Sequence, residues 1–141
     1  IDEKLIIASS KNMPGKISTV SFSGLAPLEA VKLMKWRARY RQMTFEPYGI
    51  AIEKETAHSI GIEKVQYNES KSGKKNLSCP NWLTQSKGKI TDWSNEKEFR
   101  FNGDLNLEIV PSGKSLLICF HQSEAVELEN KTGIKTVWFC D

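Results

Sequence analysis

Two carboxylates and a guanidinium alternate with aromatic rings in one short stretch, the part of the sequence best suited to chemistry. In a strand, Glu96, Glu98 and Arg100 share one face, while Phe99 and Phe101 point to the other. Side chains on the same face start about 6.5–7 Å apart at the backbone, so the three polar groups can meet. We therefore expect a polar trio on the strand 96–100, anchored by the two rings in the core.

This trio has a functional and a plain interpretation. Arg100 would keep a neighbouring carboxylate ionised, and an ionised glutamate on a rigid strand can orient a sugar hydroxyl or stabilise a developing cation. Trp93, just before the strand, would supply an aromatic wall. The plain interpretation is a solvated strand face with an ordinary ion pair worth about 0–1 kcal/mol. The sequence leaves both open.

A basic, aromatic segment precedes this strand. After Pro27, the apolar residues from Leu28 to Arg41 recur at a spacing that predicts a helix with two apolar sides. Within this expected helix, residues 32–41 contain Trp36 and Tyr40 together with lysines and arginines. Such a helix can bind phosphates or single-stranded nucleic acid, or it can be a packed helix with the basic stems lying along its surface.

The remaining elements predict an α+β fold, with a mostly antiparallel, bent or split sheet and about three helices packed on it. We expect strands at 16–22, 45–52, around 65–67, at 96–101, 105–109, 115–120 and 136–139, the 115–120 strand being central and buried. Further helices are expected at 53–60 and 123–130, with Ser123 as N-cap. The turn Asn102-Gly103-Asp104 predicts an antiparallel hairpin, and 68–91 a long loop.

The composition fits one domain over residues 1–141. The apolar share of 39%, the charged share of 26% and the net charge of +3 are ordinary for a globular protein. Three scattered cysteines indicate a reducing, cytoplasmic location, and no apolar run is long enough to span a membrane. Because the chain opens at Ile1 without methionine, we expect it to be the C-terminal part of a longer protein.

Metal and nucleotide fingerprints are missing. The cysteines and the two histidines, His58 and His121, show no Cys-x-x-Cys or His-x-x-x-His spacing, so we expect no metal site. Neither a P-loop nor a Gly-x-Gly-x-x-Gly pattern occurs. Any nucleotide binding would use another kind of site.

Three segments in order resemble a known family. Residues 48–52 (Tyr-Gly-Ile-Ala-Ile), 65–67 (Val-Gln-Tyr) and 92–100 are similar to the YGI, PV-Y and W-x-x-E-x-E-W-R blocks of bacterial abortive-infection proteins of the AbiGi type and related uncharacterised families. The resemblance covers about residues 45–105. The sequence departs from the pattern at Lys64, where the family usually has proline, and at Phe99, where it has tryptophan.

The resemblance implies a phage-defence or toxin-like role, with a loose analogy to the ADP-ribosyltransferase-like fold. It implies NAD as the cofactor, Glu98 or Glu96 as the carboxylate that orients the ribose, and Arg41 or Arg39 as a pyrophosphate contact. Tyr48 would pack against nicotinamide, and Arg100 and Trp93 would line the same pocket. Such enzymes usually have an early His or Arg motif as well, and no histidine precedes His58 here.

Two other classes of function stay open. A nucleic-acid-binding module would use the basic helix 32–41 and the lysines of 71–75. A non-catalytic regulatory or interaction domain would bind a protein partner, and its charged strand would only pair internally or with that partner. The sequence alone does not separate these from a catalytic site.

Overall fold

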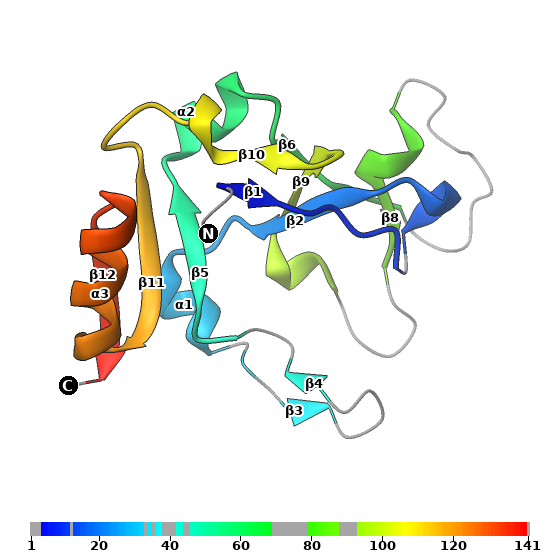
Figure 1. Cartoon of the computed structure of the whole chain (residues 1–141). Helices are drawn as coiled ribbons and strands as arrows, with labels where there is room; N and C mark the ends of the chain where they lie inside the picture. Colours follow the sequence, from blue (N-terminus) through cyan, green and yellow to red (C-terminus); the bar gives the residue numbers. More distant parts are fainter. Residues whose placement is uncertain are drawn as a thin grey trace. The chain divides into compact units, whose positions relative to one another are not determined.

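The computed structural model describes residues 4–11, 13–32, 34, 36–37, 42–43, 46–68, 79–87 and 93–140. The chain forms two compact units (Figure 1). The first unit contains Ile1–Lys4, Ala26–Ile60 and Glu108–Asp141, and the second contains Leu5–Leu25 and Gly61–Leu107. Each unit is described by itself below.

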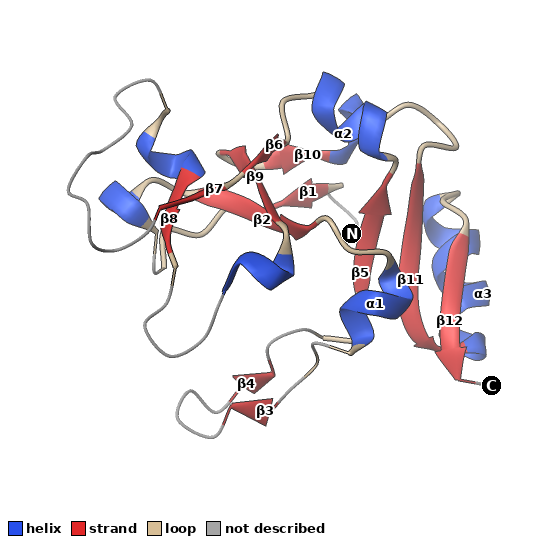
Figure 2. Cartoon of the chain, turned by 180° about the vertical axis from the view of Figure 1, so that it is seen from behind, coloured by secondary structure: helices blue, strands red, loops and turns tan. Residues whose placement is uncertain are grey.

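The first unit is built on a three-stranded sheet in the order β12-β11-β5, formed by Thr136–Cys140, Ser115–His121 and Gly49–Ile52. β12 runs parallel to β11, and β5 runs antiparallel to it. Helix α3 (Gln122–Thr132) connects the two parallel strands. In Figures 1 and 2, α3 and the short helix α1 (Pro27–Val31) lie on opposite faces of this sheet. Helix α2 (Lys54–Ser59) follows β5.

The expected central strand of this sheet is confirmed. β11 has apolar side chains on both faces, and Leu117 and Cys119 are buried, as is Ala125 on α3. A strand that is apolar on both faces belongs between two neighbours. The last strand and the helix before it are also confirmed, although α3 begins earlier than expected, with His121 rather than Ser123 as N-cap.

The described residues of the second unit form three small sheets. A three-stranded sheet has the order β2-β9-β6, formed by Thr19–Ser23, Glu98–Asn102 and Glu63–Lys64. β1 (Leu5–Ile6) pairs with β10 (Leu105–Asn106), and β7 (Gln66–Asn68) pairs with β8 (Thr84–Ser86). Short 3-10 helices lie at Pro14–Lys16, Asn81–Leu83 and Trp93–Glu96, and one at Leu107–Ile109 follows β10. The buried apolar side chains are Val20, Ile62, Val65, Leu83 and Leu105.

The fold is therefore α+β, as expected. Five of the seven strand pairs are antiparallel, and the described residues contain three α-helices. None of these helices combines the length and apolar character needed to cross a membrane. The expectation of a single domain stays a prediction.

The helix expected at 28–41 is wrong beyond its first turns. α1 ends at Val31, and the described residues that follow form two short antiparallel strands, β3 (Trp36–Arg37) and β4 (Gln42–Met43). The Lys32 N–H bonds to the Glu29 carbonyl at 3.2 Å, the tighter i to i+3 pattern that ends many helices. From position 36 to 41 apolar and basic residues also alternate strictly, which is the period of a strand.

The hairpin expected at the Asn-Gly-Asp turn is also wrong, because β9 pairs with β2 and β6, whereas β10 pairs with β1. Gly103 adopts a φ of 84°, and its N–H bonds to the Ser18 carbonyl. The Asp104 carboxylate then accepts the Ala8 N–H at 2.7 Å. These contacts direct the chain toward the N-terminal segment rather than back along β9.

The loop expected at 68–91 is only partly a loop. Residues 79–87 contain a 3-10 turn and β8, which lies parallel to β7. The lysines of 71–75 lie outside the described residues.

Candidate functional site

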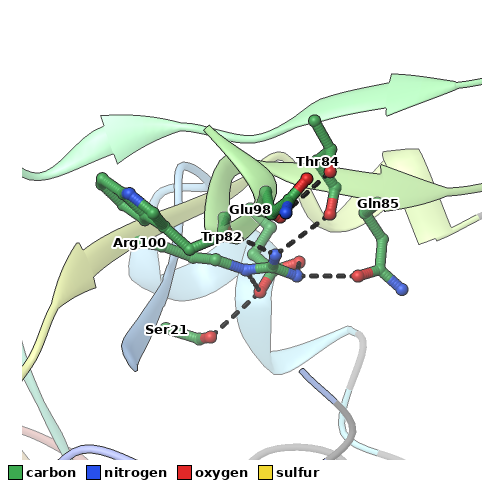
Figure 3. A network of polar contacts seen from close by, with 7 residues as sticks. Ser21, Trp82, Thr84, Gln85, Glu98 and Arg100 are labelled. Carbon is green, nitrogen blue, oxygen red and sulfur yellow. Dashed lines mark hydrogen bonds and ion pairs between the residues drawn. The ribbon is translucent and has the colours of Figure 1, made fainter. Parts of the chain in front are cut away.

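Arg100 is the centre of the polar network in the second unit (Figure 3). It lies in the middle of β9, and only 2% of it is exposed. Its Nε donates to Oε1 of Glu98 at 2.8 Å, and its Nη2 donates to Oε2 at 2.9 Å. This is the two-pronged pairing that a guanidinium makes best with a carboxylate. The predicted pairing on one strand face is present.

The other donors of Arg100 bind the segment before β9. Nη1 donates to the carbonyl oxygens of Trp82 at 2.8 Å and Thr84 at 3.4 Å, and Nη2 donates to Oε1 of Gln85 at 2.9 Å. A guanidinium has five N–H groups. All five are therefore used inside the protein, which is what allows the charge to be buried.

The Glu98 carboxylate likewise uses most of its hydrogen-bond acceptor positions. Ser21 lies opposite Arg100 on β2, and its hydroxyl donates to Oε1 of Glu98 at 2.9 Å. Oε1 thus accepts two hydrogen bonds and Oε2 accepts one, of about four that a carboxylate can take. The Glu98 side chain is 18% exposed. In the hydrogen bonds that the described residues make, Oε2 therefore has one acceptor position more than it uses, and the carboxylate that carries it is partly exposed.

Glu96 does not join this pair on a strand face, so that expectation is wrong. It ends the 3-10 helix Trp93–Glu96, and its carbonyl accepts the hydroxyl of Ser23 at 2.8 Å. Lys97 separates it from β9 with a φ of 48°. That left-handed residue breaks the alternation that would have brought Glu96 beside Glu98.

Tyr67 is a neighbour of the pair that the sequence analysis did not select. Its hydroxyl is buried and finds no hydrogen-bond partner among the described residues. Burial, and next the charge of Glu98, raise its pKa to about 12. Gln85, Trp82 and Thr84 were missed for a different reason: they lie where a loop was expected, and backbone carbonyl acceptors leave no signal in a sequence.

For the position of the other predicted ligand residues relative to Glu98, the structure gives at most the unit and the element to which each belongs. Tyr48 belongs to the first unit, where its hydroxyl donates to Oε1 of Glu124 at 3.0 Å and 52% of the residue is exposed. That hydrogen bond is the main cause of a raised pKa of Tyr48. Trp93 begins a 3-10 helix in the second unit. Arg39 and Arg41 lie outside the described residues.

Metal-ligating groups are sparse in the part of the chain that the structure describes. It holds no cluster of three or more His, Cys, Asp or Glu side chains able to bind a metal ion. Cys79, Cys119 and Cys140, all in the described part of the chain, form no disulfide.

The network thus holds the Glu98 carboxylate in a fixed orientation and uses every donor of the Arg100 guanidinium. Such a carboxylate can accept a hydrogen bond from a ligand hydroxyl, whereas the guanidinium has no donor left for a phosphate. No protein-family model matches the chain, and neither a curated protein nor a solved structure shows significant similarity to it. The resemblance to AbiGi-type proteins therefore stays a prediction from the sequence.

Proposed function

We propose that this chain is a non-catalytic regulatory or interaction domain of a bacterial phage-defence system that acts in the cytoplasm. The single observation that carries the non-catalytic part is that Arg100 and Glu98 bind each other and their own chain. The defence role is supported by the three sequence blocks, and the cytoplasmic location by three described cysteines that form no disulfide.

The bonding of Arg100 argues against a ligand role for it. A pyrophosphate or carboxylate ligand would have to displace the Glu98 carboxylate or two backbone carbonyls from a residue that is 2% exposed. Each displaced buried group would then lack its partner, at about 1–3 kcal/mol. The network instead holds residues 82–85 against β9, which is a structural task.

A second candidate is a nucleotide or NAD pocket of the ADP-ribosyltransferase-like type, lined by Glu98. The observation in its favour is that Glu98 is partly exposed and that, among the described residues, its Oε2 accepts a single hydrogen bond. Arg100 and Ser21 hold this group in one orientation, which is what a ribose-orienting carboxylate needs. A nucleic-acid role based on a basic helix at 32–41 is not proposed, because α1 ends at Val31.

Calorimetric titration with NAD and with ADP-ribose separates the two candidates. The proteins are the wild type, Glu98→Gln and, as a control, Glu63→Gln, whose exposed side chain lies opposite Arg100 on β6. A non-catalytic domain gives no saturable heat with either ligand, and Glu98→Gln lowers only the melting temperature. Saturable binding that Glu98→Gln abolishes and Glu63→Gln retains would reject the proposal and support the second candidate.

A further inference from the structure

We draw no further inference here: the strongest candidate, the exposed aromatic surface that Tyr48, Phe120 and Trp138 form on the first unit around the sheet β12-β11-β5, is an apolar patch, and nothing in the described part of the chain shows what covers it.

Discussion

Gly24 packs so closely against Phe99 that a Cβ atom on it would lie 2.5 Å from Cε2 of the ring. The same atom would lie 3.0 Å from the carbonyl oxygen of Lys97, which accepts the Gly24 N–H at 2.9 Å. This close approach holds the end of β2 beside the start of β9. It explains why a glycine follows a strand of larger residues.

Gly24→Ala should therefore destabilise the protein. The ring or the backbone must move to make room, and overpacking of this kind typically costs about 1–3 kcal/mol. Urea unfolding followed by circular dichroism measures the loss. Gly49→Ala is the matched control, since a Cβ there meets nothing within 4 Å. Equal effects of the two substitutions would contradict the steric explanation.

Tyr67→Phe should leave stability at pH 7 unchanged or raise it by up to about 1 kcal/mol. The hydroxyl is buried without a hydrogen bond to a described residue, so its removal abolishes a desolvation cost and breaks no hydrogen bond within the described part of the chain. Thr19→Val tests the same reasoning at a second site, because the Thr19 hydroxyl is also buried and unpaired among the described groups. A loss of stability in both variants would show that these hydroxyls have partners.

The same tyrosine should make the protein sensitive to alkali. The pKa of Tyr67 is raised to about 12 in the folded protein, above the ordinary tyrosine value of 10.0. The unfolded chain therefore loses this proton first, and stability falls as the pH rises from about 10 toward 12. Denaturant unfolding at pH 9, 10 and 11 should show a shallower decline for Tyr67→Phe than for the wild type. Parallel curves would reject the raised pKa.

Glu124 should stabilise α3 only while it is ionised. Its carboxylate accepts the His121 N–H at 3.0 Å and the Tyr48 hydroxyl at 3.0 Å, and the first of these bonds is the main cause of its lowered pKa. A lowered pKa gives stability that is present above the ordinary glutamate pKa of 4.5 and is lost as the pH falls through the lower pKa of the folded state. At acidic pH, the wild type should therefore no longer be more stable than Glu124→Gln.

Thermal melts at pH 7 and pH 3 test this loss. Glu124→Gln should melt below the wild type at pH 7, and the gap should narrow at pH 3. Glu127→Gln, an exposed position on the same helix, serves as the control for a lost surface charge. An equal difference in melting temperature between the wild type and Glu124→Gln at both pH values would show that the stabilisation does not depend on ionisation of Glu124.

Arg100→Met should cost about 3–5 kcal/mol, because it leaves the Glu98 carboxylate without its cation. The double variant Arg100→Met/Glu98→Leu removes both charges and should recover much of that loss, since apolar replacements of buried ion pairs are often neutral. Urea unfolding of the two variants gives the comparison. If the double variant were as unstable as the single one, the bonds to residues 82–85 would carry the stability instead.

Secondary structure was predicted most accurately in segments where the apolar residues follow a single period. The apolar run of β11, the helix that Gly133 ends with a φ of 70°, and the final strand all follow from local patterns. The pairing of Glu98 with Arg100 was also predictable, because spacing on a strand fixes which side chains share a face. The partners of Arg100 from residues 82–85 were not, since backbone carbonyls of a distant segment have no sequence signature.

Two of the expected elements, the helix at 28–41 and a strand that includes Glu96, differ from the structure, each for its own physical reason. Around Trp36 the residues fit both a helical and a strand period, and short-range pairing between β3 and β4 prevails in the described residues. At the other site, Lys97 adopts a left-handed conformation that a sequence normally announces with glycine or asparagine. A lysine does not predict a left-handed residue, and the sequence pattern therefore extends the strand back to Glu96.

Lys97→Gly should consequently stabilise the protein by about 1 kcal/mol. Lys97 has a φ of 48°, a conformation that costs a residue with a side chain about 1–2 kcal/mol and costs glycine almost nothing. Glycine also makes the unfolded chain more flexible, and this offsets part of the gain in folding stability. The Lys97 N–H donates to the Ser94 carbonyl, and the Lys97 carbonyl accepts the Gly24 N–H. Both are backbone bonds and remain in the variant. Lys64→Gly, in the extended strand β6, is the opposite control and should destabilise. Urea midpoints of the two variants should lie on opposite sides of the wild type, and a destabilised Lys97→Gly would mean that the lysine side chain itself holds the turn.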